Sequence, residues 1–314
     1  MKSIVMWHDL QIKQLLCTLL MVFRKIGQWL IMDGKPVFFV LLLFFSGISQ
    51  TSAQPKESKP VSVPDSEHHL IHSKIAGHDY DLYIHFPATY DTAKTKFPVL
   101  YVMDGANDFS PTIEYLGLLM AEYHIKEPIV VAIGDGGLIG SASNKRNRDF
   151  TPSVSASVPG SGGASQFLSF IEKEVIPFVE SEYKADPGDR TCYGYSMGGL
   201  FSTYVLFKKP YLFKNILIGS PALSYDQGKV FEIENEYATK HTELPVHVFI
   251  EVGELEMQEQ KISFQKLVDL LHTRKYQKLD LHTVTIEKVT HLTGKPVTML
   301  KALGWAYTQP HQIF

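Results

Sequence analysis

A glycine-rich turn around Ser196 constrains the fold of this chain more than any other segment. Residues 194–198 read Gly-Tyr-Ser-Met-Gly, which is the pattern G-x-S-x-G. Residues 191–193 predict the end of a buried strand before this turn, and residues 200–206 predict the apolar face of a helix after it. The flanking glycines let the backbone bend tightly enough to lift the Ser196 hydroxyl above the sheet. The segment therefore predicts an exposed nucleophile; the alternative is a glycine-rich turn whose serine has no chemical role.

Short apolar strands alternate with helical patterns along the rest of the chain. Such alternation is typical of a mostly parallel central sheet with helices on both faces, which is an α/β fold. We see no internal repeat and no second folded domain. The predicted strands span 69–75, 80–86, 99–103, 129–133, 191–195, 216–218, 246–252 and 279–286, and the predicted helices span 112–123, 165–183, a segment from 197, 258–273 and 296–307.

The N-terminal residues have the pattern of an export signal. Residues 37–45 are entirely apolar, Lys35 precedes them, and small residues follow up to Ala53. This arrangement predicts a secretory signal peptide cleaved after Ala53, and hence export to the periplasm or the medium. The apolar run is short for a membrane span, so we expect no stable span after cleavage; an uncleaved anchor is the alternative. Met32 is an alternative start for the same signal peptide.

These features divide the chain into three parts. Residues 1–53 are the predicted leader, and residues 54–67, rich in Pro, Ser and Lys, are a predicted disordered spacer. Residues 68–314 then form the predicted catalytic domain.

Composition excludes several classes of function. The formal net charge is −3 and the basic residues are scattered, so no nucleic-acid partner is expected. The two cysteines are Cys17, in the leader, and Cys192, so the mature chain has no internal disulfide. No His, Cys and Asp residues have the spacing of a zinc site, and the glycine-rich segment 134–140 lacks a phosphate-binding signature. We therefore expect neither a metal nor a cofactor.

A serine nucleophile needs a base, an acid and an oxyanion hole. His291 lies in a predicted loop between the last strand and the last helix, which is where the base is found when the order is serine, acid, histidine. The acid is expected at the end of strand 246–252, where either Glu254 or Glu256 qualifies. The backbone N–H of Met197 and that of Ala106, in the loop after an early strand, are the candidate oxyanion donors.

Four segments resemble the Putative esterase family of α/β hydrolases, which includes enterochelin-esterase-like proteins, feruloyl esterases, S-formylglutathione hydrolases and mycolyltransferases. They are residues 98–105 (Pro-Val-Leu-Tyr-Val-Met-Asp-Gly), 146–152 (Arg-Asn-Arg-Asp-Phe-Thr-Pro), 194–200 (Gly-Tyr-Ser-Met-Gly-Gly-Leu) and 252–256 (Val-Gly-Glu-Leu-Glu) with His291 after them. The resemblance spans roughly residues 69–308 and is strongest to the enterochelin-esterase-like branch.

The resemblance implies an α/β-hydrolase fold and hydrolysis of carboxylic esters through an acyl-enzyme. It places the acid at Glu256, although some relatives work with a serine–histidine pair. The implied substrate is a small-molecule ester, such as a siderophore, or an acyl ester on a polysaccharide. Arg148 would bind a substrate carboxylate or catecholate oxygen, unless it forms a salt bridge with Asp149. The alternatives are acyl transfer to a sugar or alcohol, and a catalytically inactive binding protein on the same scaffold.

Overall fold

The computed structural model describes residues 62–308. These residues belong to one compact unit. Within them, regular structure begins at Ser66, two residues before the catalytic domain predicted from the sequence. The predicted leader, its cleavage site after Ala53 and the alternative start at Met32 lie outside the described residues.

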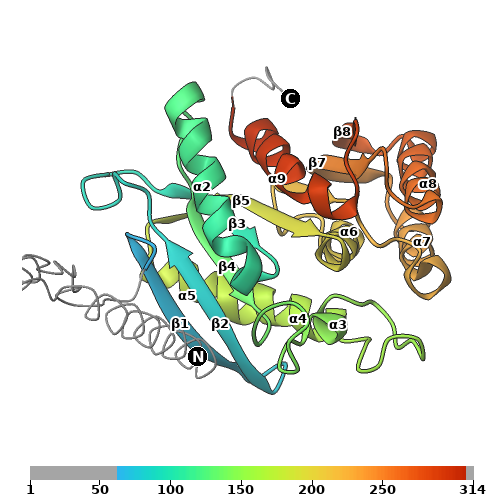
Figure 1. Ribbon diagram of the computed structural model, residues 1–314, viewed down its shortest axis with the longest axis horizontal. Coiled ribbons are helices and arrows are strands. Elements are labelled where there is room, and N and C mark those ends of the chain that lie inside the picture. Colours follow the sequence, from blue (N-terminus) through green and yellow to red (C-terminus); the bar gives the residue numbers. More distant parts are fainter. Residues whose placement is uncertain (1–61, 309–314) are drawn as a thin grey trace, which may run out of the picture. The chain divides into compact units, whose positions relative to one another are not determined.

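The described chain contains one eight-stranded sheet, which is mostly parallel as predicted (Figure 1). Its strand order is β1-β2-β4-β3-β5-β6-β7-β8, and only the β1–β2 and β2–β4 pairs are antiparallel. The carboxyl ends of β3, β5, β6 and β7 therefore meet at one edge of the sheet, where ligands bind in open α/β folds. The strands are β1 (Ser66–Ser73), β2 (His78–His85), β3 (Phe97–Val102), β4 (Ile129–Gly134), β5 (Ala185–Tyr195), β6 (Asn215–Gly219), β7 (Glu243–Gly253) and β8 (Gln277–Ile286).

Helices cover both faces of this sheet, as predicted. Helices α2 and α9 share one apolar cluster with the sheet, and α4, α5, α6, α7 and α8 contribute to the cluster on the other face (Figure 1). The helices are α2 (Gly105–Tyr123), α3 (Arg146–Asp149), α4 (Ala164–Phe170), the π-helical turn η1 (Ile171–Val175), α5 (Ile176–Glu182), α6 (Met197–Lys208), α7 (Tyr225–Ala238), α8 (Gln258–Arg274) and α9 (His291–Tyr307).

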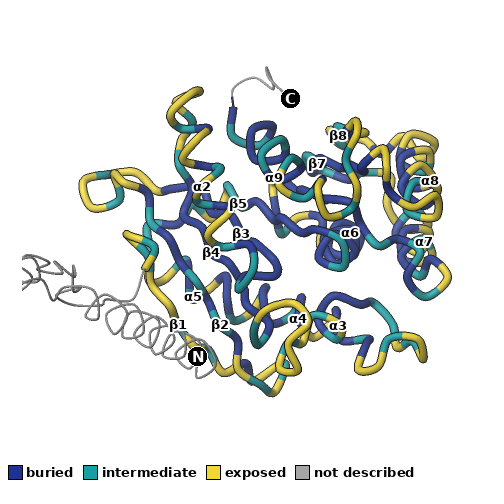
Figure 2. Tube along the Cα trace, in the orientation of Figure 1, coloured by how far each residue is buried: buried dark blue, intermediate teal, exposed yellow. Residues whose placement is uncertain are grey.

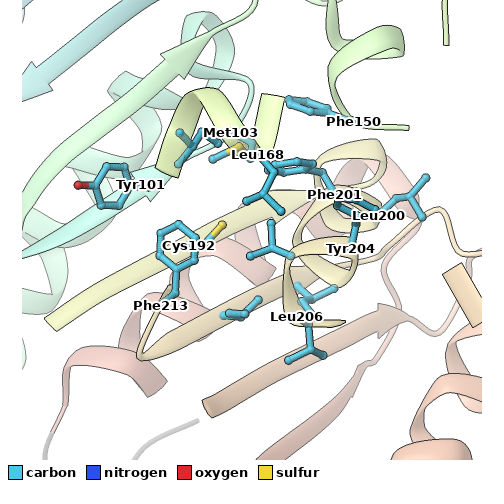
Figure 3. Packing of buried hydrophobic residues seen from close by; sticks show 14 of the residues in the cluster. Tyr101, Met103, Phe150, Leu168, Cys192, Leu200, Phe201, Tyr204, Leu206 and Phe213 are labelled. Carbon is cyan, nitrogen blue, oxygen red and sulfur yellow. The ribbon is translucent and has the colours of Figure 1, made fainter. Parts of the chain in front are cut away.

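The core consists of two layers because side chains alternate between the faces of each strand. On β3, Leu100 and Val102 pack toward α2 and α9, whereas Val99 and Tyr101 pack toward the opposite face. Strands β3, β4 and β6 are buried along their length (Figure 2). Figure 3 shows aromatic and aliphatic side chains of α6 packed beside Cys192, which is a buried free thiol. A sheet buried on both faces gives a rigid platform for the loops at its carboxyl edge.

Two segments predicted as loops are helix N-termini. Helix α2 begins at Gly105 rather than near residue 112, and α9 begins at His291 rather than near residue 296. Pro111 and Pro296 lie inside these helices, where each removes only one backbone hydrogen bond close to the helix start. Thr290 compensates at α9 through a capping box with Thr293. The predicted oxyanion donor Ala106 and the predicted base His291 therefore lie in first helical turns.

A buried carboxyl group lies under the same edge of the sheet. Glu251 on β7 has no solvent exposure, and its C=O accepts a hydrogen bond of 3.0 Å from the N–H of Ser220. Burial raises the pKa of Glu251 to about 8, and the nearby Glu256 carboxylate also raises it. Glu251 is therefore protonated in the folded protein at neutral pH.

We expect Glu251 to make the fold less stable as pH rises. Between the ordinary glutamate pKa of 4.5 and about 8 the unfolded chain releases a proton that the folded chain keeps, so the free energy of unfolding falls across this window. One such group contributes about 1.4 kcal/mol per pH unit. Because glutamine resembles the protonated acid, Glu251→Gln should gain stability relative to the parent as pH rises from 5 to 8. Denaturant unfolding at both pH values measures this, and parallel pH profiles for the two proteins would contradict it.

Candidate active site

Ser196 occupies a strained turn between β5 and α6. Its backbone angles are φ 60° and ψ −115°, which side-chain-bearing residues rarely adopt. The neighbouring glycines make this turn possible, because a Cβ on Gly194 would lie 2.2 Å from the Gly198 carbonyl oxygen. A Cβ on Gly199 would lie 2.6 Å from the Gly219 oxygen. The glycines of the sequence pattern are therefore required sterically. The turn that they permit holds the Ser196 hydroxyl at the carboxyl end of β5.

His291 joins Ser196 to Glu256. His291 Nε2 lies 2.9 Å from Ser196 Oγ, and His291 Nδ1 lies 2.8 Å from Glu256 Oε2. In the tautomer that satisfies both contacts, Nδ1–H donates to the carboxylate and the serine hydroxyl donates to Nε2. The structure therefore brings these three sequence-predicted residues into one hydrogen-bonded chain.

Of the two candidate acids, the structure places Glu256 against the imidazole. The Glu256 side chain is 1% exposed, whereas Glu254 is exposed and its Oε2 accepts a hydrogen bond of 2.7 Å from the Lys288 N–H. Burial would raise the pKa of Glu256, but hydrogen bonds from His291, Ser220 and the Gly253 N–H together lower it below its usual value. Glu256 is thus held as a carboxylate next to His291.

The two candidate oxyanion donors lie at adjacent helix starts. Met197 is the first residue of α6 and Ala106 the second of α2, and N–H groups in a first turn have no acceptor within their own helix. Gly105 lets α2 begin against β4, because a Cβ there would lie 2.7 Å from the Ile133 carbonyl carbon. A Cβ on Gly198 would lie 3.4 Å from Asp104 Oδ2, so the two helix starts are close together. Both N–H groups therefore lie at the carboxyl edge of the sheet with Ser196.

Asp104 fixes the start of α2 rather than joining the serine and histidine. Its φ of 55° is left-handed, and its carboxylate is 2% exposed. Arg146 binds both carboxylate oxygens, with Nε–Oδ1 at 2.7 Å and Nη2–Oδ2 at 3.0 Å. This bidentate pair connects α3 to the start of α2, whose first turn carries Ala106.

Ser220 is a site residue that the sequence analysis missed. Its hydroxyl lies 2.7 Å and 2.6 Å from the two carboxylate oxygens of Glu256 and 3.1 Å from His291 Nδ1. Gln260 holds the same segment by donating to the Ser220 carbonyl at 2.9 Å and the Pro221 carbonyl at 2.6 Å. Its position directly after β6 could have indicated a role in the site. Strand β6 lies beside β5, which carries the serine, so the carboxyl ends of both strands lie at the same edge of the sheet.

Residues 219–222 also contact the nucleophile turn. The Ser196 N–H donates to the Gly219 oxygen at 2.9 Å, and the Ala222 N–H donates to the Ser196 oxygen at 3.0 Å. Ser220 itself has a φ of 34°. One short segment therefore sets the positions of both the serine and the acid.

Ser220→Ala should weaken this alignment without removing a reacting group. The change deletes a donor to the Glu256 carboxylate, so we expect kcat to fall by about tenfold, the equivalent of one hydrogen bond of about 1.5 kcal/mol, with KM little changed. Ser220→Cys keeps a side chain of similar size with a weak S–H donor and avoids a β-branched residue at this positive φ, so it is the matched control and should retain more activity than Ser220→Ala. Equal loss in both variants would show that packing, and not the hydroxyl, explains the effect.

Arg148 has an internal charge partner. Its Nε and Nη2 lie 2.8 Å and 2.7 Å from Oδ1 of Asp149, and its Nη2 also contacts His78 and, at 3.1 Å, the Tyr80 hydroxyl. The Arg148 side chain is 32% exposed, whereas that of Asp149 is 1% exposed. The salt-bridge alternative from the sequence analysis is therefore present, and substrate binding by Arg148 stays a prediction.

Arg148→Ala separates these two roles. Leaving the buried Asp149 carboxylate unpaired should lower the free energy of unfolding by about 1–3 kcal/mol. This loss is smaller than for a fully buried ion pair because Arg148 is partly exposed. If Arg148 only pairs with Asp149, the ratio of KM values for an anionic and a neutral ester should stay unchanged. A selective rise in KM for the anionic ester would instead establish that Arg148 binds substrate.

Within residues 62–308, no group of three or more His, Cys, Asp or Glu side chains is placed to hold a metal ion. In the same range, no helix is long and apolar enough to cross a membrane. Independently of these absences, the hydrogen-bonded chain of Ser196, His291 and Glu256 offers nucleophilic attack by an activated hydroxyl, with hydrogen-bond stabilisation of an oxyanion.

Comparisons with known proteins agree with this geometry. The family model described as Putative esterase matches residues 73–288. The ferri-bacillibactin esterase of Bacillus subtilis is 26% identical over 267 residues, covering 79% of this chain and 92% of the relative. A siderophore triacetylfusarinine C esterase of Aspergillus fumigatus is 31% identical over 171 residues, covering 52% of this chain and 58% of the relative. The crystal structure of a BES protein from Bacillus cereus matches with a TM-score of 0.70 at 27% identity, covering 81% of this chain and 98% of that one.

Proposed function

The chain belongs to the Putative esterase family and is a carboxylic ester hydrolase, and from this premise we propose that it cleaves ester bonds in siderophores. The family assignment confirms the resemblance found in the sequence. Two observations support the substrate class: the Aspergillus fumigatus relative is described as a siderophore esterase, and the Bacillus subtilis relative, a ferri-bacillibactin esterase, is matched over nearly its whole length. The observation that carries the reaction is the hydrogen-bonded chain of Ser196, His291 and Glu256.

In the proposed first half-reaction, Ser196 Oγ attacks the ester carbonyl carbon. His291 Nε2 accepts the hydroxyl proton as the new C–O bond forms, while Glu256 stabilises the imidazolium through Nδ1–H. The carbonyl oxygen becomes an oxyanion, which the N–H groups of Met197 and Ala106 stabilise. The tetrahedral intermediate collapses when the bond to the leaving alcohol breaks and His291 returns the proton to that alcohol.

The second half-reaction removes the acyl group from Ser196. A water molecule attacks the acyl-enzyme, and His291 Nε2 accepts a proton from it. A second oxyanion forms at the same N–H groups and then expels Ser196 Oγ, which regains its proton from His291. The products are a carboxylic acid, an alcohol and the starting enzyme.

The substrate class can be tested with purified protein and three kinds of ester. The panel contains the tris-ester siderophores bacillibactin and enterobactin, each with and without iron, feruloyl esters and p-nitrophenyl acetate. We expect kcat/KM for a siderophore to exceed that for a feruloyl ester by at least about 100-fold, or about 2.7 kcal/mol in transition-state stabilisation. Ser196→Ala is the control for uncatalysed hydrolysis. Preferential cleavage of the feruloyl esters would contradict the proposed substrate while leaving the ester chemistry intact.

We also propose that the protein is exported, as residues 1–53 predict. The support is the apolar segment 37–45 followed by small residues up to Ala53. N-terminal sequencing of the protein recovered from its native envelope or medium should give Gln54 as the first residue. A chain that still begins at Met1 or Met32 would contradict cleavage at this site.

A further inference from the structure

The side chain of Tyr195 connects the nucleophile turn to the main chain of the histidine. Tyr195 is the last residue of β5 and directly precedes Ser196. Its hydroxyl donates a hydrogen bond of 2.6 Å to the backbone carbonyl oxygen of His291, and the centres of the two rings lie 5.2 Å apart. Glu256 contacts His291 through the imidazole, whereas Tyr195 bonds to its backbone. The position of the base therefore depends on contacts to both parts of the residue.

The fold leaves a fitted space for the Tyr195 ring between the sheet and α9. Tyr195 is buried in the apolar cluster on the α9 face of the sheet. Gly219 on the neighbouring strand β6 makes room for it, because a Cβ there would lie 2.5 Å from Tyr195 Cδ2 and 2.9 Å from Thr298 Cγ2. A Cβ on Gly294 would lie 3.4 Å from the Tyr195 hydroxyl oxygen. The ring is therefore enclosed, and its hydroxyl lies against the first turn of α9.

The Tyr195 hydroxyl keeps its proton at neutral pH. Burial raises the pKa of Tyr195 well above its usual value, and the Glu251 and Glu256 carboxyl groups raise it further, whereas a hydrogen bond with Ser220 lowers it. A neutral phenol can donate to a carbonyl oxygen, but a phenolate cannot. Tyr195 is therefore a lasting donor to the His291 carbonyl.

The first turn of α9 has few internal bonds to hold His291 in place. Helix ends fray, and α9 begins at His291 itself. Pro296 has no N–H, so it removes one of the backbone hydrogen bonds that would close this turn. The capping box of Thr290 and Thr293 fixes the N–H groups at the helix start. The bond from Tyr195 adds an attachment from the sheet to the carbonyl side of the same turn.

We propose that Tyr195 is a positioning residue for ester hydrolysis. Its hydroxyl holds the backbone of His291 so that Nε2 stays within hydrogen-bonding distance of Ser196 Oγ, and this role rests on the proposed function. Because the hydroxyl bonds to a main-chain atom of the base, it acts through His291 and not on the reacting atoms. The competing explanation is that the hydroxyl only stabilises the packing of α9 on the sheet.

Tyr195→Phe tests this role because it removes the hydroxyl and keeps the ring. With p-nitrophenyl acetate we expect kcat to fall by about tenfold, since a small displacement of a catalytic group costs a factor of this order. KM should change by less than about twofold, because His291 serves both half-reactions and the substrate contacts are untouched. The rate at which a fluorophosphonate labels Ser196 should fall by the same factor as kcat, since this reaction also needs the serine to be activated.

Tyr193→Phe is the matched control. Tyr193 lies two residues earlier on β5, and its ring belongs to the same apolar cluster. Its hydroxyl is buried and has no hydrogen-bond partner among residues 62–308. The change should leave kcat and the labelling rate within about twofold of the parent. Each kcat is divided by the amount of Ser196 that the fluorophosphonate finally labels, so that unfolded protein does not count as slow enzyme.

Three results would overturn the proposal. If kcat and the labelling rate of Tyr195→Phe stay within about twofold of the parent while its melting temperature falls, the hydroxyl serves packing alone. Equal losses in the two tyrosine variants would likewise assign the effect to the core. A higher KM with unchanged kcat would place Tyr195 in substrate binding instead. A parent protein that is labelled at Ser196 but cleaves no ester would contradict the proposed function, and the ratio of labelling rates would still test Tyr195.

Discussion

Ser196→Ala is expected to lower kcat for ester hydrolysis by at least about 10³-fold while the protein remains folded. The side-chain oxygen that forms the acyl bond is removed, and this is the hydroxyl that lies 2.9 Å from His291 Nε2. The backbone of the turn is held by Gly194, Gly199 and the Ser196 main-chain bonds, which the substitution leaves in place. Steady-state kinetics with p-nitrophenyl acetate, together with a melting curve, measure both effects.

Ser202→Ala is the control for this variant. Ser202 lies on α6, the helix that follows Ser196, and is buried, but its hydroxyl contacts Cys192 Sγ at 3.7 Å rather than His291. It should keep kcat within about threefold of the parent. Turnover by Ser196→Ala within a few-fold of the parent would remove Ser196 from the mechanism.

Glu256→Gln should produce the second largest loss, with kcat falling by about 10² to 10⁴-fold and KM little changed. The glutamine amide can present a donor to His291 Nδ1, which favours the tautomer that cannot accept the Ser196 proton. It also lacks the negative charge that stabilises the imidazolium. Steady-state kinetics on a neutral ester separate the effect on kcat from that on KM.

Glu254→Gln is the matched control, because Glu254 lies two residues away and its side chain contacts the loop at Lys288. It should be nearly silent. A larger loss in Glu254→Gln would transfer the acid role to that residue. Near-silence in both variants would show that Ser196 and His291 act as a pair without an acid.

The central strands and the nucleophile turn were predictable because their causes are local. A strand buried on both faces has to be apolar along its length, and residues 129–133 and 216–218 have that pattern. The glycines around Ser196 are required by contacts within a few residues and with the next strand, so the motif and its conformation coincide. The position of His291 followed from the order of elements along the chain.

The starts of α2 and α9 were not predictable from local rules. Helix α2 extends upstream of Pro111 and α9 upstream of Pro296, where each proline removes only one backbone hydrogen bond, and the capping box of Thr290 and Thr293 stabilises the earlier start of α9. Helix α7 was missed because Gly228 and the left-handed Asp226 and Gln227 interrupt its first turn. The apolar residues of α7 that recur at helical spacing are too few to predict a helix across that interruption.

The contacts that complete the site are also non-local. Ser220 meets Glu256 and His291 only because β6 lies between β5 and β7, and strand order does not follow from any single segment. The same holds for Arg148, whose neighbours His78 and Tyr80 lie about 70 residues earlier. Residue types suggested candidate roles, and the sheet topology decided which partners they have.

The most direct test of the account is to label the folded protein with a fluorophosphonate and locate the adduct by peptide mass spectrometry. Such probes react with a serine that a neighbouring base has activated. We expect one adduct per chain, on the peptide that contains Ser196, with ester turnover lost in proportion to labelling and no adduct in Ser196→Ala. An adduct on another serine, or full turnover in protein that is completely labelled at Ser196, would contradict the account.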